Sequence, residues 1–117
     1  DGVQQRDCLY VLDVVDALGK AAQQVATGSI NAGEVINLGH TEVLSLLEIA
    51  KLVVSRSGQG STISCIPWPE ELARIDIGGF SGDYAKAHRL LNWTPQVAFA
   101  DGVEQALDFY RRNSWYL

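Results

Sequence analysis

The spacing of apolar residues changes several times along the chain, and each spacing predicts an element. Near the start, apolar side chains recur every three or four positions, as on one face of a helix: Val14, Val15, Leu18, Ala21, Ala22 and Val25. Asp13 precedes them and is expected to cap this helix. Residues 8–11, just upstream, are mostly apolar and predict a short strand.

A second strand and helix follow in the same order. Residues 34–38 form a compact, largely apolar run that ends at Gly39, which predicts a strand. Ser45 and Glu48 have the three-residue spacing of a capping box, so a helix is expected from there to about Ser57. Residues 62–66 are rich in β-branched side chains and predict a third strand.

Two helices are expected at the C-terminal end. Asp83 can cap a helix that runs through Leu91. Asp101 and Glu104 have the spacing of a second capping box, for a helix to about Arg112. Strands that alternate with helices are typical of α/β proteins with parallel pairing. The sequence therefore predicts one α/β domain over residues 1–117, of the βαβαβ type with two C-terminal helices.

Composition narrows the choice of partners. The chain has 117 residues, of which 47% are hydrophobic and 20% are charged, and this favours one compact domain over disorder. The net charge of −5 and the lack of a Lys/Arg cluster argue against nucleic acid, because a phosphate backbone needs a basic face. No apolar run is long enough to cross a bilayer and no leader is recognisable. We therefore expect neither a membrane partner nor secretion, and a cytoplasmic location.

The two cysteines, Cys8 and Cys65, lie far apart in strand-like apolar surroundings. This context favours buried thiols over a disulfide or a metal site. We expect no zinc.

The first fourteen residues, DGVQQRDCLYVLDV, form the most informative segment. They place a polar turn directly before the predicted strand and helix. Within them, Arg6 offers a rigid fork of N–H donors that matches two phosphate oxygens at once, which a lysine would not. An Arg-Asp pair taken alone is more often a solvated surface pair. What favours the binding role is the resemblance of the whole segment to the motif of a known family.

The segment resembles the one that opens the substrate-binding part of extended short-chain dehydrogenases/reductases, the NAD(P)-dependent nucleotide-sugar epimerases and dehydratases. That family has roughly D-G-x-Q-x-R-D-[FYW]-x-Y-V-x-D at this place. The similarity continues in the expected order with GEVINLG and SLLEIA, then GDYAKA and LLNWTP, and finally DGV and FYR. The resemblance covers nearly the whole chain.

The resemblance implies a set of substrate-binding residues. In the family, the arginine at the position of Arg6 holds the diphosphate of a nucleoside-diphosphate sugar. Gln4 and Cys8 belong to the same segment, and Cys8 replaces the usual aromatic residue. His40 and Thr41 lie in a G-H-T-E run similar to the G-H-N-E run whose asparagine approaches the nucleotide. Thr41 offers fewer hydrogen bonds than asparagine, and His40 is also explained as an ordinary polar loop residue.

Many relatives have an arginine that gives the diphosphate a second cationic contact, but this position holds Asp76 here. A carboxylate would repel a diphosphate, so either Arg74 reaches in or Arg6 acts alone. Trp68 could close over a base or pack in the core. Trp93 is expected to pack under the last helix rather than touch a ligand.

Two sequence motifs on which the family's catalysis depends do not occur in this sequence. They are the G-x-x-G-x-x-G turn that holds the dinucleotide and the Tyr-x-x-x-Lys pair that moves the proton. The resemblance thus implies a parent enzyme that binds NAD or NADP on an N-terminal dinucleotide-binding domain missing here, while this chain alone binds no cofactor and is inactive. The lack of methionine fits a piece of a longer protein. The alternative is a standalone, non-catalytic module that forms a homodimer or binds another protein through the surface that the missing domain would cover.

Overall fold

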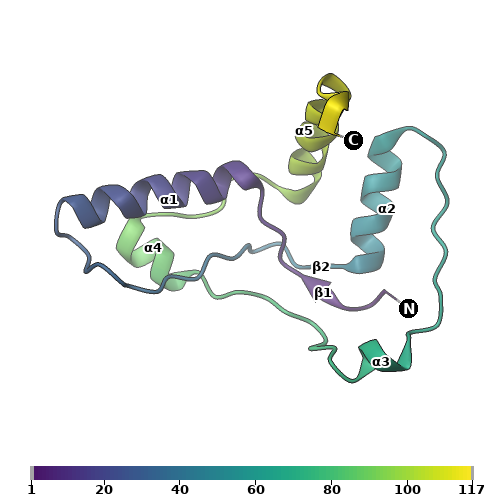
Figure 1. Cartoon of the computed structure of the whole chain (residues 1–117), viewed down its shortest axis with the longest axis horizontal. Coiled ribbons are helices and arrows are strands. Elements are labelled where there is room, and N and C mark those ends of the chain that lie inside the picture. The colour runs from purple at the N-terminus through teal and green to yellow at the C-terminus, as the bar shows by residue number, and fades with distance from the viewer. Residues whose placement is uncertain (1, 117) are drawn as a thin grey trace.

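The computed structural model describes residues 2–116, apart from the side chain of Ala73, and shows an α/β chain (Figure 1). Asp1, which begins the opening motif, and Leu117 lie outside the described residues. Within residues 2–116 the elements follow one another as β1 Gln5–Arg6, α1 Val11–Ala26, β2 Leu44–Ser45, α2 Leu46–Ser57, α3 Glu70–Ala73, α4 Ala85–Leu91, α5 Phe99–Arg112 and the 3-10 helix η1 Ser114–Tyr116.

The sheet differs from the predicted one in position and direction. β1 and β2 pair antiparallel, with Gln5 opposite Ser45 and Arg6 opposite Leu44. Parallel pairing was the wrong prediction, and residues 8–11, 34–38 and 62–66 form no strand. A strand needs a neighbouring chain for its N–H and C=O groups. Residues 34–38 and 62–66 have no such ladder in the described part of the chain, so only the first four elements keep the βαβα order.

Two helices begin earlier than predicted, and neither uses its predicted local cap. α1 begins at Val11, so Asp13 lies in its first turn and accepts hydrogen bonds from the distant backbone instead of capping the helix. α5 begins at Phe99, and its N–H donates to the Glu42 carboxylate at 2.9 Å; the capping box predicted at Asp101 does not form.

The capping box at the start of α2 is confirmed. The Glu48 N–H donates to the Ser45 hydroxyl at 3.2 Å, and the Glu48 carboxylate accepts from the Ser45 N–H at 2.8 Å. The Ser45 hydroxyl donates to the same carboxylate at 2.7 Å, and this bond, followed by the one from the Ser45 N–H, holds the pKa of Glu48 below its ordinary value of 4.5. The helix ends at Ser57, as predicted, and Gly58 closes it in the left-handed conformation with φ of 68°. Asp83 does not cap α4 as predicted: the N-cap position is Tyr84, without a side-chain cap hydrogen bond, although the Asp83 carboxylate accepts from the Ala85 N–H at 2.8 Å.

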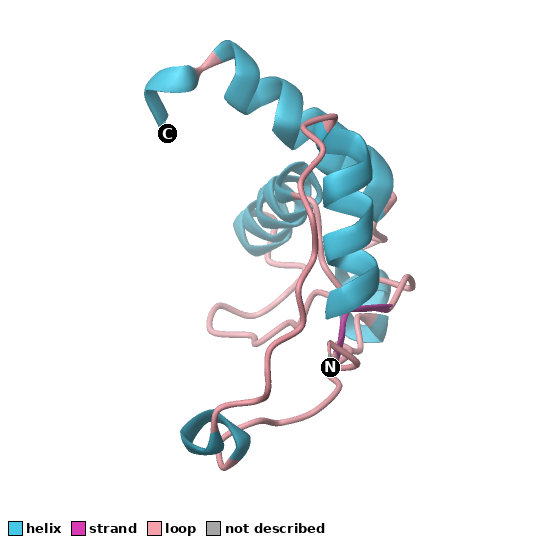
Figure 2. Cartoon of the chain, turned by 90° about the vertical axis from the view of Figure 1, so that its right-hand side faces the viewer, coloured by secondary structure: helices cyan, strands magenta, loops and turns pink. Residues whose placement is uncertain are grey.

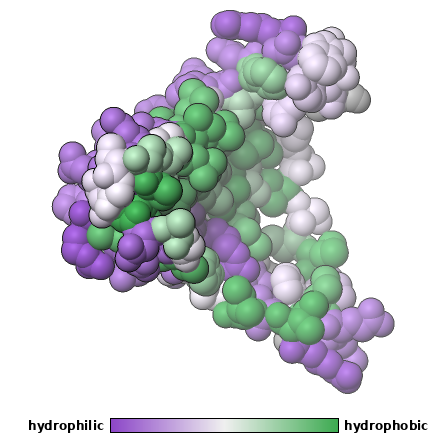
Figure 3. All heavy atoms as spheres, turned by 60° about the vertical axis from the view of Figure 1, so that its left-hand side comes forward, coloured by the Kyte–Doolittle hydropathy of each residue, from purple (hydrophilic) through white to green (hydrophobic). Residues whose placement is uncertain are grey.

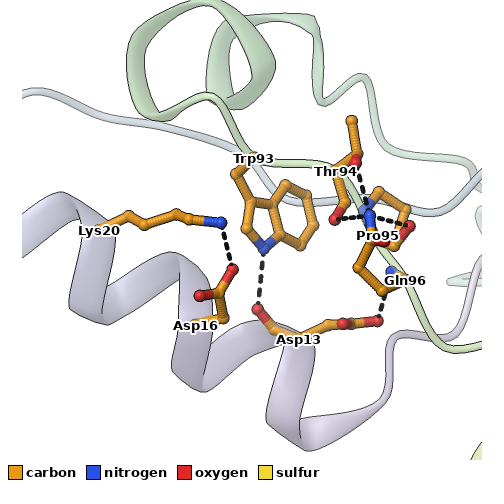
Figure 4. A network of polar contacts seen from close by, with 7 residues as sticks. All are labelled: Asp13, Asp16, Lys20, Trp93, Thr94, Pro95 and Gln96. Atoms are coloured by element: carbon orange, nitrogen blue, oxygen red, sulfur yellow. Dashed lines mark hydrogen bonds and ion pairs between the residues drawn. The ribbon is translucent and has the colours of Figure 1, made fainter.

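The helices pack as two pairs, α1 with α4 and α2 with α5 (Figures 1 and 2). The fully enclosed core lies in the first pair and consists of Ala17, Ala87, Leu91 and Trp93. The indole N–H of Trp93 donates to the Asp13 carbonyl oxygen at 3.0 Å (Figure 4). Trp93 is therefore a packing residue, as predicted, but it packs against α1 and not under the last helix.

The chain is open rather than compact. Its radius of gyration is 17.4 Å, whereas a compact domain of this length has about 13 Å. Several large apolar side chains remain exposed as a result, and Figure 3 shows them gathered on the face toward the α1 end. Cys8 and Cys65 are both free thiols, but only Cys8 is half-buried. The prediction of a buried Cys65 was wrong, because residues 61–70 pair with no strand that would cover them.

Candidate functional site

Gln4 directly precedes β1 and Arg6 ends it, and this spacing of two positions places their side chains on the same face of the extended chain. The segment 76–80 runs along this strand and contacts both. The Arg6 Nη1 group donates to the Gly78 carbonyl oxygen, and the Gln4 amide Nε2 donates to the Asp76 carboxylate at 3.4 Å. The Phe80 N–H adds a backbone bond of 2.9 Å to the Gln5 carbonyl oxygen. The structure thus brings Gln4, Arg6 and Asp76 together.

Arg6 is held by backbone atoms through one edge of its guanidinium. Its Nη1 group donates to the carbonyl oxygens of Gln5 and Gly78, both at 2.7 Å. A guanidinium has five N–H donors, so the Nε and Nη2 donors remain for another acceptor. Among residues 2–116, Arg6 forms no ion pair with a carboxylate. The half-buried side chain therefore keeps an uncompensated charge and a free donor fork.

Asp76 accepts hydrogen bonds from one distant and one nearby residue. Its second carboxylate oxygen accepts from the Gly78 N–H at 3.2 Å, while the first accepts from Gln4. The bond to Asp76 also orients the Gln4 amide, whose oxygen is buried and finds no hydrogen-bond donor in the described chain. Arg74 is exposed, and its guanidinium forms no hydrogen bond or ion pair with any described residue.

The loop with His40 and Thr41 reaches this region through Asp7. The Asp7 carboxylate accepts from the His40 N–H at 3.3 Å. The His40 ring is buried, and its Nδ1 accepts from the Glu42 N–H at 2.8 Å, so its own proton lies on Nε2. Thr41 is exposed beside it. The role of Asp7 escaped the sequence analysis, although its place next to Arg6 in the opening motif was a usable signal.

Cys8 lies next to α5. It lines a small apolar cavity of about 180 Å³ with Tyr10, Phe99 and Gly102. Partial burial, and then the neighbouring Asp7 charge, raise the pKa of the Cys8 thiol, while Arg6 lowers it. Cys8 is therefore a neutral thiol at pH 7.

Trp68 borders a different hollow. This hollow has a volume of about 220 Å³ and lies between the start of the chain, α2 and the segment 63–68, with Gln4 in its wall. Trp68 is half-exposed there, so it is not a core residue of the described chain.

Two further observations concern the described residues only. No three His, Cys, Asp or Glu side chains in residues 2–116 gather closely enough to hold a metal ion. None of the described helices combines the length and the apolar character required to span a bilayer.

Comparison with known proteins identifies the family. Residues 1–106 match the family of GDP-mannose 4,6 dehydratase, and the chain belongs to this family. The proteins it matches include nucleotide-sugar epimerases and dehydratases, which confirms the resemblance drawn from the motifs. The UDP-glucose 4-epimerase of Mycolicibacterium smegmatis is 30% identical over 115 residues, which cover 97% of this chain and 34% of the epimerase.

Solved structures agree with this assignment. The UDP-glucose 4-epimerase of Thermotoga maritima, solved with UDP-glucose, superposes with a TM-score of 0.79 at 26% identity, over 97% of this chain and 34% of that one. The UDP-glucuronic acid 4-epimerase of Bacillus cereus, solved with NAD, gives a TM-score of 0.74 at 29% identity, over 97% and 33%. The chain thus spans about a third of the length of these relatives.

Proposed function

We propose that this chain is the substrate-binding portion of an NAD- or NADP-dependent nucleotide-sugar epimerase or dehydratase. In this proposal the chain holds a nucleoside-diphosphate sugar, and a dinucleotide-binding domain outside this sequence carries the cofactor and the hydride chemistry. Membership of the family supports the proposal, as do the UDP-glucose bound by one relative and the NAD bound by another.

The free donor fork of Arg6 carries the proposal. Two backbone carbonyl oxygens fix one edge of the guanidinium, so the other edge is presented in a set direction with little entropy left to lose. Nε–H and Nη2–H together match two oxygens of one phosphate group. With no carboxylate paired to Arg6 in the described residues, a diphosphate would supply the missing negative charge. The Asp76 carboxylate keeps its charge but accepts from Gln4 and Gly78, and it forms no ion pair with Arg6 in the described residues.

Replacing Arg6 is expected to weaken diphosphate binding selectively. The Arg6→Ala variant loses two charge-assisted hydrogen bonds, so the dissociation constant for UDP should rise at least about tenfold. Arg6→Lys keeps the charge but not the fork of donors. Its dissociation constant for UDP should lie between those of the unchanged chain and Arg6→Ala. Titration calorimetry with UDP, and with uridine as the ligand that lacks phosphate, measures both effects.

Arg89 provides the matched control, because it is an exposed arginine on α4, away from the strand. Arg89→Ala should bind UDP as the unchanged chain does, and uridine binding should not depend on Arg6. Equal UDP affinities for the unchanged chain and Arg6→Ala, with the circular dichroism spectrum preserved, would remove Arg6 from the site.

A second candidate function, self-association, is favoured by the exposed apolar side of α1. The α1 stripe consists of residues that share one side of the helix and are all exposed: Val11, Val15, Leu18, Ala22 and Val25. Beside it lies an apolar groove of about 220 Å³ between α1, the segment 30–38 and Leu91. An apolar surface of this kind is a site for association. In this alternative, the stripes of two copies pack together in a homodimer.

Sedimentation velocity over a concentration series tests the alternative. A dimer held by the α1 stripe should dissociate in Leu18→Glu, because the new carboxylate would be buried without a partner. Gln23→Glu adds the same charge on the polar side of the same helix and should leave the dimer intact. A monomer at every concentration would contradict self-association.

A further inference from the structure

Three segments of the chain meet at a single carboxylate oxygen. Oδ2 of Asp7 accepts from the Gly82 N–H at 2.8 Å and from the His40 N–H at 3.3 Å. Asp7 directly follows β1, Gly82 precedes α4, and His40 lies in the loop before β2. One side chain therefore connects parts of the sequence that are 33 and 75 residues away from it.

The backbone around this carboxylate is packed without room for further side chains. A Cβ atom on Gly39 would lie 2.3 Å from the Gly82 carbonyl oxygen and 2.9 Å from Asp7 Oδ2. A Cβ atom on Gly82 would lie 3.0 Å from the Leu38 carbonyl oxygen. The two glycines let the two backbones approach each other directly. Asp7 then supplies the acceptor that the N–H groups of Gly82 and His40 need in this contact.

The contact continues beyond Asp7 on both sides. On one side, the His40 ring accepts from the Glu42 N–H, and the Glu42 carboxylate accepts from the first N–H of α5. On the other side, the segment that ends at Gly82 begins at the turn where Arg6 is anchored to the Gly78 carbonyl oxygen. A displacement of Asp7 would therefore reach the loop of His40 and the anchor of Arg6 together.

The Asp7 charge is not used to neutralise its neighbour. Arg6 and Asp7 are adjacent in sequence, so their side chains point to opposite sides of the extended chain. No ion pair between them occurs in the described residues. The Asp7 carboxylate accepts from backbone N–H groups, and the Arg6 guanidinium has no carboxylate partner among the described residues.

We propose that Asp7 is a positioning residue of the Arg6 site, which fixes the His40–Thr41 loop and the segment 78–82 relative to the guanidinium. The proposal rests on the proposed function, because it gives Asp7 a role at the same diphosphate site. It assigns no contact between Asp7 and the ligand. Asp7 acts through the two peptide N–H groups that it holds.

Amide hydrogen exchange measured by NMR tests the holding role without any ligand. In Asp7→Ala the exchange rates of the Gly82 and His40 amides should rise about tenfold or more, because their acceptor is gone, while amides in the middle of α1 keep their rates. Asp7→Asn retains an acceptor oxygen without the charge and should restore much of the protection. Asp83→Ala is the matched control: among the described residues its carboxylate accepts from the Ala85 N–H alone, so the Gly82 and His40 amides should be unaffected.

UDP binding tests the link to the site. Asp7→Ala should weaken UDP severalfold while the affinity for uridine changes little, and Asp7→Asn should recover most of the UDP affinity. Unchanged exchange of both amides in Asp7→Ala would overturn the proposal, and so would unchanged UDP affinity in a chain that binds UDP. If the unchanged chain binds no UDP, the proposed function fails, and the exchange experiment still decides whether Asp7 holds the two loops.

Discussion

Replacing Trp93 by alanine should lower the free energy of unfolding by about 3–5 kcal/mol, the largest effect expected for any single side chain here. Trp93 is completely buried and is the largest side chain in that state. Its ring meets Tyr84 edge-on, with the ring centroids 6.1 Å apart, and its N–H holds the Asp13 carbonyl oxygen of α1 (Figure 4). Removing it leaves a cavity where α1, α4 and the following turn meet. Urea denaturation followed by circular dichroism measures the loss.

Two further tryptophan variants separate the effect of burial and the effect of the hydrogen bond to Asp13 on the free energy of unfolding. Trp115 is 75% exposed, so Trp115→Ala should change the stability by less than about 0.5 kcal/mol. Trp93→Phe keeps most of the apolar volume but loses the hydrogen bond to Asp13, and should cost less than Trp93→Ala. If the two alanine variants were equally stable, the core would not be centred on Trp93.

Replacing Asp13 by alanine should lower the free energy of unfolding by about 2–4 kcal/mol. The Asp13 side chain is buried, and one carboxylate oxygen accepts from the Gln96 N–H and the Val97 N–H, both at 3.0 Å. These bonds attach the turn before α5 to the first turn of α1. Alanine would leave two peptide N–H groups in a part-buried place without an acceptor. The loss should appear as a lower urea midpoint with an unchanged slope.

The next acid of the same helix is the matched control for Asp13. Asp16 pairs with Lys20 at 2.6 Å, but both side chains are more than a third exposed. Water screens such a pair, so Asp16→Ala should cost less than about 1 kcal/mol. Asp13→Asn keeps an acceptor for both amides and should lose only part of the stability. A loss at Asp16 as large as that at Asp13 would mean that the turn before α5 is held by other contacts.

Some of this structure follows from short-range rules. The Ser45–Glu48 capping box and the end of α2 at Gly58 depend on residues within three or four positions of one another, and both form as predicted. The long helix of residues 11–26 was also predicted, since its apolar spacing repeats over four turns. The start of that helix was placed wrongly, because Asp13 has the sequence context of a cap but turns to amides more than eighty residues away.

The strands show the opposite case. Residues 34–38 and 62–66 have strand-like sequences, but a strand forms only where a second chain accepts and donates its hydrogen bonds. The described chain offers no such partner to either segment. The two short strands that do form, β1 and β2, pair through backbone groups and carry no strong periodic signal in their two residues each.

The sequence by itself determined the family, the α/β class and the candidate Arg6, because ordered motifs over nearly the whole chain are enough for that purpose. Only the tertiary structure decided how the site is arranged. It showed that Arg6 is anchored at Gly78, that Asp76 is occupied by Gln4, and that Asp7 joins two distant loops. The physical reason is the separation in sequence: these contacts join residues between 33 and 75 positions apart, and no local spacing rule reports on such contacts.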